Sequence, residues 1–291
     1  MRALLIIGLA LVASASAFVK VTSDYHADVG IPLAARIKAD EDAYFSKRGS
    51  LDRIVGGVIA PTNAHPYFAG LLISLVGVAG NSVCGSTLLT TNRLVTAAHC
   101  WRSTTHQASQ FLVVLGTNFL YSGGTRIATS MIVMHPQYVA STLNNDVAMI
   151  YLPSNVLLSA SIQPIALPNA ADQWNEFVGV WGTACGYGRT SDQQAGASTV
   201  MSHVSLQVIS VAQCWQTYGS PWVIQSTLCT SGTGGVGICG GDSGGPLVTN
   251  HNGQLILIGI SSFAASNACQ GWHPSGFARV TSALSFINQN L

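Results

Sequence analysis

Three short blocks of this sequence each place one chemically capable side chain among small residues, and these side chains are His99, Asp146 and Ser243. A serine hydroxyl is a poor nucleophile near neutral pH unless a base removes its proton, and an imidazole held by a carboxylate is such a base. Taken singly, a histidine beside a cysteine is more often a packed residue, and an aspartate before an apolar strand is more often a turn or cap. The four glycines around Ser243, however, supply more backbone freedom than an ordinary turn needs. Together the blocks predict catalysis by an activated serine.

The order of these residues along the chain excludes two rival enzyme classes. The stretch around Ser243 also satisfies the Gly-x-Ser-x-Gly elbow of α/β-hydrolases, in which an acid and then a histidine must follow the serine. No aspartate or glutamate follows Ser243. The subtilisin order needs an acid before His99, and every such acid lies upstream of Ile54, in a segment that we expect to be removed. Only the order histidine, aspartate, serine remains.

The three blocks, together with Arg53 followed by Ile-Val-Gly-Gly, resemble those of the chymotrypsin and trypsin family of serine proteases over residues 53 to about 280. The resemblance implies that Ser243 attacks the scissile carbonyl, that His99 takes and returns its proton, and that Asp146 holds the imidazole. It also implies an oxyanion hole made by the backbone N–H groups of Gly241 and Ser243. The expected substrates are proteins or peptides, protein protease inhibitors are expected partners, and no cofactor is needed. A protease-like binding protein without activity is the alternative, but its usual mark, a missing triad residue, is absent here.

The pattern of elements predicts an all-β fold. After Ile54 the sequence reads as short β-branched and apolar runs separated by glycine and turn residues. The family resemblance implies two antiparallel six-stranded β-barrels with the active site between them, the N-terminal barrel over about 54–160 and the C-terminal barrel over about 168–280. Residues 281–291 carry apolar side chains at helical spacing and are expected to form a terminal helix.

The first 53 residues differ in composition from the rest of the chain. Residues 1–17 have the layout of a cleavable secretory signal, with Arg2, an apolar stretch and a small-residue end. Residues 18–53 are rich in charge, whereas no lysine occurs after Arg53. We therefore expect an activation propeptide over 18–53 and a protease domain over 54–291. By resemblance, a trypsin-like protease cuts after Arg53, and the new amino terminus of Ile54 pairs with Asp242.

Seven cysteines follow the signal, so at least one cannot form an internal disulfide. No Cys-x-x-Cys or His-Glu-x-x-His motif occurs, and the loop after Gly116 lacks carboxylates, so no metal site is expected. The resemblance implies the pairs Cys84 with Cys100, Cys214 with Cys229, and Cys239 with Cys269. Cys185 is left over, either as a buried inert thiol, which we favour, or as a reactive one.

The resemblance also places the substrate pocket. Six residues before Ser243, where trypsins carry an acid at the pocket floor, this chain has Gly237. A basic side chain buried there would lose its hydration without gaining a partner. With Ala264 and Ser275 expected in the walls, we predict cleavage after large apolar or aromatic residues, with an elastase-like or broad preference as the alternative.

The overall composition indicates which partners and which location to expect. The chain is 48% hydrophobic and 8% charged with a net charge of +1, which indicates a packed globular protein and offers no basic run for nucleic acid. No segment besides the signal approaches the roughly 20 apolar residues that span a bilayer. We therefore expect a secreted monomer with no membrane partner. The missing lysines and a resemblance to insect midgut chymotrypsins favour a digestive lumen.

Overall fold

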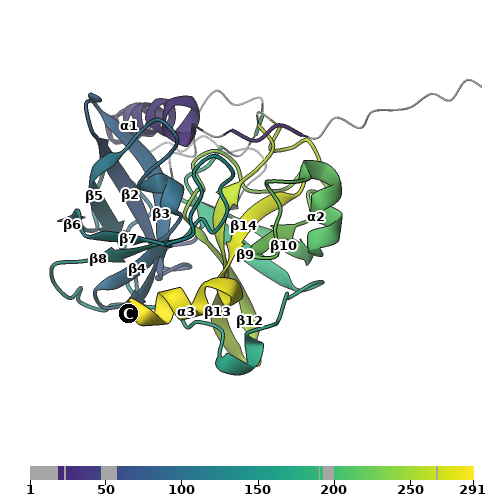
Figure 1. The fold of residues 1–291 in the computed structure, drawn as a ribbon. Helices are drawn as coiled ribbons and strands as arrows, with labels where there is room; N and C mark the ends of the chain where they lie inside the picture. Colours follow the sequence, from purple (N-terminus) through teal and green to yellow (C-terminus); the bar gives the residue numbers. More distant parts are fainter. Residues whose placement is uncertain (1–18, 23, 47–57, 190, 193–199, 267) are drawn as a thin grey trace, which may run out of the picture.

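The computed structural model describes residues 19–22, 24–46, 58–189, 191–192, 200–266 and 268–291. The signal over 1–17 and the activation residues Arg53 and Ile54 therefore lie outside the described residues. Two β-barrels lie side by side, as Figure 1 shows, with the N-terminal one in blue and teal and the C-terminal one in green and yellow. The all-β fold class predicted from the sequence is confirmed.

The N-terminal barrel is a sheet with the strand order β6-β5-β2-β3-β4-β8-β7. Its strands are β2 (Phe68–Leu75), β3 (Asn81–Thr90), β4 (Arg93–Thr96), β5 (Ala108–Leu115), β6 (Thr125–Thr129), β7 (Ile132–Met134) and β8 (Ala148–Tyr151). The consecutive strands β6 and β7 pair with β5 and β8 respectively, so the stretch 125–134 closes the ring. If β6 and β7 are taken as one interrupted strand, the barrel is six-stranded, although the sheet has seven separate strands.

The C-terminal barrel has the strand order β1-β10-β11-β14-β13-β12-β9, and β9 also pairs with β10. Its strands are β1 (Val58–Ile59), β9 (Trp181–Gly186), β10 (Ser202–Ile209), β11 (Thr227–Thr230), β12 (Pro246–His251), β13 (Gln254–Phe263) and β14 (Ser275–Arg279). The second pairing of β9 closes a six-stranded ring, and β1 is an added strand on β10. β1 thus joins the C-terminal sheet although it precedes the N-terminal barrel in the chain.

In the part of the chain that the structure describes, six helical segments surround the barrels: η1 (His26–Gly30), α1 (Ile31–Ser46), η2 (Ala98–Cys100), η3 (Ala170–Asp172), α2 (Val211–Tyr218) and α3 (Val280–Gln289). The C-terminal helix α3 was predicted, and it buries Leu284 and Ile287 against the core. The helices α1 and α2 were not predicted from the sequence. α2 begins with a capping box between Ser210 and Gln213, a local signal for a helix start.

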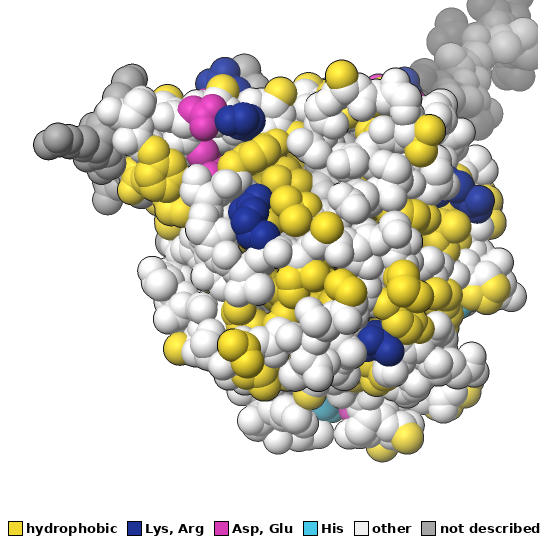
Figure 2. All heavy atoms as spheres, turned by 90° about the vertical axis from the view of Figure 1, so that its left-hand side faces the viewer, with side chains coloured by type: hydrophobic (Ala, Val, Ile, Leu, Met, Phe, Trp, Pro, Cys, Tyr) yellow, Lys and Arg dark blue, Asp and Glu magenta, His cyan; other side chains and the backbone are white. Residues whose placement is uncertain are grey.

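The helix α1 covers part of the N-terminal barrel and contacts β3 (Figure 1). Its buried residues, Leu33, Ala34, Ile37 and Glu41, recur at helical spacing. Charged side chains occupy its exposed face, including the i,i+4 pairs of Arg36 with Asp40 and Lys38 with Asp42. Figure 2 shows this side of the molecule, where most of the visible acidic side chains gather near the top, at the height of α1.

Candidate active site

His99 and Asp146 form a buried hydrogen-bonded pair. The Nδ1 atom of His99 lies 2.6 Å from Oδ2 of Asp146, and the backbone N–H of His99 donates to Oδ1 at 2.8 Å. Because an ionised carboxylate only accepts hydrogen bonds, Nδ1 carries the proton in this pair. The neutral ring then has its lone pair on Nε2, the atom that a general base uses. The hydroxyl of Ser262 also donates to Oδ2 of Asp146, at 2.6 Å.

The backbone around Asp146 explains why its side chain points inward. Asn145 has a positive φ of 53°, a conformation that asparagine adopts more readily than most residues. Its side chain donates to the carbonyl of Gln137 and accepts from the hydroxyl of Ser226, which fixes the turn just before β8. The turn aims the following carboxylate at His99, where it is fully buried.

Ser243 lies in a glycine-rich loop held between the two barrels. Its carbonyl accepts from the N–H of Gly85 in β3 at 2.7 Å, and the N–H of Gly244 donates to Ser261 in β13 at 2.8 Å. Gly244 has a φ of +77°, and a Cβ there would lie 2.2 Å from Oγ1 of Thr96. The glycine at this position is therefore required both by its backbone conformation and by the close approach of the N-terminal barrel.

The acid before the serine, Asp242, is buried but has no charged partner among the described residues. Its carboxylate accepts from the backbone N–H groups of Gly188 and Cys239, both at 2.9 Å. Burial raises the pKa of Asp242 to about 6, and these two hydrogen bonds counter part of the rise. Gly186 and Gly188 make room for the side chain, since a Cβ on either would lie 2.3 Å from one of its oxygens.

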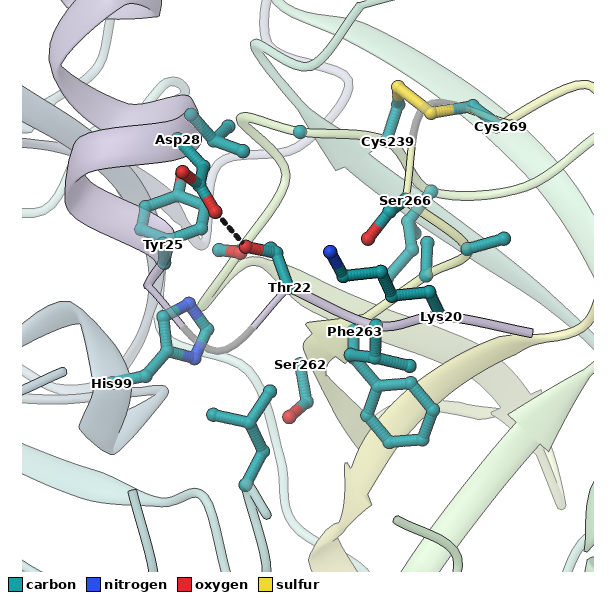
Figure 3. A pocket seen from close by; sticks show the side chains of 18 of the residues that line it. Lys20, Thr22, Tyr25, Asp28, His99, Cys239, Ser262, Phe263, Ser266 and Cys269 are labelled. Carbon is teal, nitrogen blue, oxygen red and sulfur yellow. Dashed lines mark hydrogen bonds between the residues drawn. A yellow bond between two sulfur atoms is a disulfide. The ribbon is translucent and has the colours of Figure 1, made fainter. Parts of the chain in front are cut away.

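The chain's own N-terminal segment, residues 19–46, crosses the cleft between the barrels. A cavity of about 490 Å³ is lined by His99 and Ser243 and also by several residues between 20 and 29 (Figure 3). The ring of Tyr25 packs edge-on against His99 with 4.8 Å between ring centroids. Within the described part of the chain, no hydrogen bond joins His99 to Ser243. Neither the position of Tyr25 at the site nor the hydrogen bond from Ser262 to Asp146 was predicted from the sequence.

The three residues assigned to the substrate pocket are not gathered around this cavity. Ala264 lines it, together with Phe263 and Ile238. Gly237 borders a separate hollow of about 50 Å³. A Cβ on Gly237 would lie 2.7 Å from Oγ of Ser275, so these two residues face each other. The structure therefore brings Gly237 and Ser275 together and leaves Ala264 at the main cleft.

Three disulfides support the cleft, and they are the pairs that the family resemblance implies: Cys84 with Cys100, Cys214 with Cys229, and Cys239 with Cys269. The first ties the segment of His99 to β3, and the third ties the loop before Ser243 to residue 269. Cys185 is a free, buried cysteine. Burial raises the pKa of its thiol, which keeps it protonated and unreactive.

The described residues include potential metal ligands that lie close together. Two groups of three potential metal ligands occur there, one with His99 and one with Asp192, but the two cysteines of each group belong to disulfides. Disulfide sulfurs are not thiolates, the form that binds metals. No helix in the described part of the chain is long and apolar enough to cross a membrane.

Comparisons with known proteins agree with this geometry. Residues 54–287 match the Trypsin family. The chain is 34% identical to "Collagenase" of Hypoderma lineatum over 82% of this chain and 87% of that protein, and 36% identical to "Brachyurin" of Leptuca pugilator over 80% and 96%. A solved structure of HL collagenase matches with a TM-score of 0.73 at 34% identity, covering 81% of this chain and 98% of that one. The chain therefore belongs to the trypsin family and is a serine endopeptidase.

Proposed function

We propose that this protein is a secreted digestive serine endopeptidase, made as a zymogen, in which His99, Asp146 and Ser243 form the catalytic triad. The observation that carries the proposal is the buried pair of His99 and Asp146, because the histidine of this pair lines the same cavity as Ser243 of the glycine-rich loop. This pair fixes the proton on Nδ1 and leaves Nε2 free to accept one.

In the proposed reaction, Oγ of Ser243 bonds to the scissile carbonyl carbon while Nε2 of His99 takes the hydroxyl proton. The N–H groups of Gly241 and Ser243 stabilise the oxyanion. When the tetrahedral intermediate collapses, the C–N bond breaks and His99 gives the proton to the leaving amine. A water molecule, deprotonated by His99, then attacks the carbonyl carbon of the acyl-enzyme. The bond from that carbon to Oγ of Ser243 breaks, His99 returns the proton to Oγ, and the acid product leaves.

Processing after Arg53 by a trypsin-like protease is the proposed activating step. The buried Asp242 supports this step, because its carboxylate has only backbone donors and a pKa raised by burial. A positive amino group at Ile54 would supply the missing countercharge, and a buried carboxylate with such a partner is far more favourable than one without.

For specificity, we propose cleavage after large apolar or aromatic residues. The uncharged Gly237 supports this preference, because a basic side chain buried against a glycine at the pocket floor would lose its hydration without gaining a carboxylate partner at that position. An elastase-like preference for small residues is the alternative, and protein inhibitors of proteases remain expected partners.

The test is to treat the full-length chain with immobilised trypsin, remove the trypsin, and assay peptide substrates ending in Phe, Ala and Arg. We expect activity only after treatment, labelling of Ser243 by an organophosphate, a new amino terminus at Ile54, and the order Phe, Ala, Arg in kcat/KM. Arg53→Gln is the matched control for processing and should stay inactive. Dominance of the Arg substrate would contradict the proposed specificity, and activity in Ser243→Ala would contradict the proposed mechanism.

Collagen is a second candidate substrate, favoured by the relative and the solved structure named collagenase. Incubating the processed enzyme with native collagen and with heat-denatured collagen tests it. Cleavage of the native form would support a collagenase, whereas cleavage of the denatured form alone would indicate a general endopeptidase.

A further inference from the structure

The N-terminal segment is anchored on the N-terminal barrel by a buried carboxylate. Oε1 of Glu41 accepts from the backbone N–H groups of Leu120 and Tyr121 at 2.6 Å and 3.0 Å. In return, the hydroxyl of Tyr121 donates to the carbonyl of Ala34 in α1 at 3.0 Å. Glu41 is 1% exposed, so these contacts form inside the interface and away from solvent. Two backbone donors would lose their partner if this side chain were removed.

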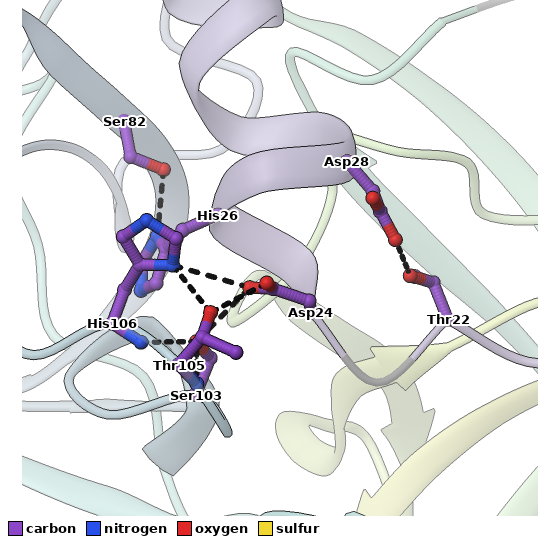
Figure 4. A network of polar contacts seen from close by, with 8 residues as sticks. All are labelled: Thr22, Asp24, His26, Asp28, Ser82, Ser103, Thr105 and His106. Carbon is purple, nitrogen blue, oxygen red and sulfur yellow. Dashed lines mark hydrogen bonds and ion pairs between the residues drawn. The ribbon is translucent and has the colours of Figure 1, made fainter.

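A polar network holds the start of the segment to the same barrel (Figure 4). The carboxylate of Asp24 accepts from the hydroxyls of Ser103 and Thr105, in the loop that follows His99. The Nδ1 atom of His26 lies 2.8 Å from Oγ of Ser82 in β3, and His26 is fully buried. Gly30 passes so close to Ser82 that a Cβ there would lie 1.9 Å from Oγ. The segment and the barrel are therefore fitted to each other.

Between these anchors, Tyr25 occupies the catalytic centre. Its hydroxyl donates to the carbonyl of Val83 at 2.7 Å, while its ring lies against His99. Burial raises the pKa of Tyr25, and Ser243 and the backbone of Gly241 lie near enough to the phenol oxygen to lower that pKa in part. The phenol thus lies where the oxyanion hole is expected.

Other side chains of the segment cover the neighbouring glycine loop. A Cβ on Gly241 would lie 2.4 Å from Cδ2 of Leu33, and one on Gly240 would lie 2.6 Å from Cγ1 of Val29. These distances show that the segment packs directly on the backbone before Ser243. A substrate carbonyl could not reach this backbone while the segment is in place.

The first residues of the segment run along the C-terminal barrel. The N–H of Ser266 donates to the carbonyl of Lys20 at 2.9 Å, and the N–H of Val19 donates to the carbonyl of Thr217 at 3.1 Å. Val21 is buried in an apolar cluster that also contains Leu143, Phe263 and Tyr218. The segment therefore contacts both walls of the cleft.

The backbone conformation distinguishes this arrangement from a bound substrate. Tyr25 has φ −54° and ψ −44°, in the α-helical region, and it leads directly into η1 and α1. Its side chain, rather than its peptide bond, faces Ser243. A peptide bond inside a helix is not presented to a nucleophile, so we expect the segment to block the site without being cut there.

Residues 18–53 contain no cysteine, and all three disulfides join later parts of the chain. Cutting after Arg53 would therefore free the segment from any covalent link to the protease. We propose that the released segment is a reversible inhibitor of the processed enzyme, with Tyr25 blocking the catalytic centre and Glu41 as its main anchor. This inference rests on the proposed zymogen function, and it adds a ligand for the mature cleft.

The experiment uses the enzyme processed after Arg53, purified away from its N-terminal segment, and a synthetic peptide of residues 18–53. We expect competitive inhibition of cleavage of a substrate ending in Phe. The inhibition constant should rise at least about tenfold in the Tyr25→Ala peptide, because buried aromatic anchors dominate such interfaces. It should rise about tenfold in the Glu41→Ala peptide, which leaves two backbone donors unpaired.

Asp42→Ala is the matched control, because Asp42 is the adjacent acid on the exposed face and pairs only with Lys38 within α1. Its inhibition constant should change less than about twofold, as expected for a surface ion pair. Peptide variants avoid the question of whether a mutant zymogen folds. Mass spectrometry of the peptide after incubation should find the bond after Tyr25 intact.

Three results would overturn the proposal: no inhibition by the unmodified peptide up to its solubility limit, equal loss for Glu41→Ala and Asp42→Ala, or rapid cleavage after Tyr25. An active enzyme that ignores the peptide would reject this inference and leave the proposed function standing. If the processed protein were inactive, the proposed function would fail. Binding of the peptide to that protein, measured by calorimetry, would then support this inference, and absence of binding would overturn it.

Discussion

On the N-terminal-barrel side of the cleft, His99 and Asp146 are joined by two hydrogen bonds and are fully buried. On the C-terminal-barrel side, Gly237 and Ser275 face each other beside a separate small hollow, and only Ala264 borders the main cavity. The residues for proton transfer are thus already assembled in the unprocessed chain, whereas those assigned to substrate selection are not. The contrast suggests that activation mainly completes the substrate-binding side.

The N-terminal segment shows the same asymmetry. Its contacts with the N-terminal barrel include the buried Glu41, the network of Asp24 and His26, and the Tyr25 hydroxyl. Its contacts with the C-terminal barrel are two backbone hydrogen bonds, the burial of Val21, and the packing of Val29 and Leu33 on the glycine loop before Ser243. The hydrogen bonds made by side chains of the segment are therefore concentrated on the N-terminal barrel, which also carries His99 and Asp146.

The largest effect is expected from Asp146→Asn in the processed enzyme. An asparagine would offer an N–H or a weaker acceptor to Nδ1 and would favour the wrong imidazole tautomer, a change that costs about 10⁴-fold in kcat in this family. Steady-state kinetics on a Phe substrate should show this loss with little change in KM. A loss below about a hundredfold would contradict the view that His99 and Asp146 already have their catalytic arrangement in the unprocessed chain.

Asp242→Asn should cause the next largest loss. A broken buried ion pair costs about 3 to 5 kcal/mol, which corresponds to roughly 150- to 5,000-fold in the population of the active form. The loss should appear in kcat/KM after processing, measured on the same substrate. Asp172→Asn alters another buried acid, which pairs with His251 and does not line the active-site cavity, so it should keep activity within about twofold of wild type.

Much of the site could be predicted from the sequence because its chemistry lies in short local blocks. His99, Asp146 and Ser243 each stand in a motif whose order along the chain excludes other enzyme classes. The strands could be predicted as a class because their apolar runs are bounded by glycines and turn residues. The disulfide pairs followed from the family resemblance and match those of the structure.

The position of the N-terminal segment could not be predicted in the same way. Its charges indicate a solvated, removable stretch, and the burial of Glu41 depends on the backbone donors of Leu120 and Tyr121, about 80 residues away. The packing of Gly237 against Ser275 likewise depends on a three-dimensional approach that neither local sequence reveals. Helical spacing of Leu33 and Ile37 was the one available signal for α1.

Acid should weaken binding of the segment to the processed enzyme. Burial lowers the pKa of His26 to about 3, with His99 and His106 adding to the decrease and Asp24 opposing it. A depressed histidine pKa stabilises the bound form above the free value of about 6.5, and this contribution is lost as the pH falls from 6.5 toward 3. The dissociation constant of the 18–53 peptide should therefore rise about 30-fold between pH 7.5 and pH 5.

Calorimetry with the processed Ser243→Ala protein measures this change without cleavage. Burial raises the pKa of Glu41, which acts in the opposite direction, so the control is a His26→Asn peptide that keeps Glu41. Its binding should be flat or should strengthen toward pH 5. Equal weakening of both peptides would assign the effect to the protease and not to His26.

The smallest effect is expected from Ser275→Ala, on the C-terminal-barrel side of the cleft. The hydroxyl of Ser275 accepts from the N–H of Ile238 at 3.0 Å and lies against Gly237. If processing brings these residues to the pocket floor, removing the hydroxyl makes that floor more apolar and should raise the ratio of kcat/KM for Phe over Ala substrates about three- to tenfold. The ratio is the useful readout because the unpaired N–H of Ile238 will lower stability and activity for both substrates.

The control is Ser205→Ala, at an exposed position on β10, which should leave the ratio unchanged. An unchanged ratio in Ser275→Ala would mean that Ser275 stays away from the pocket after processing. The difference between the two sides of the cleft would then persist in the processed enzyme.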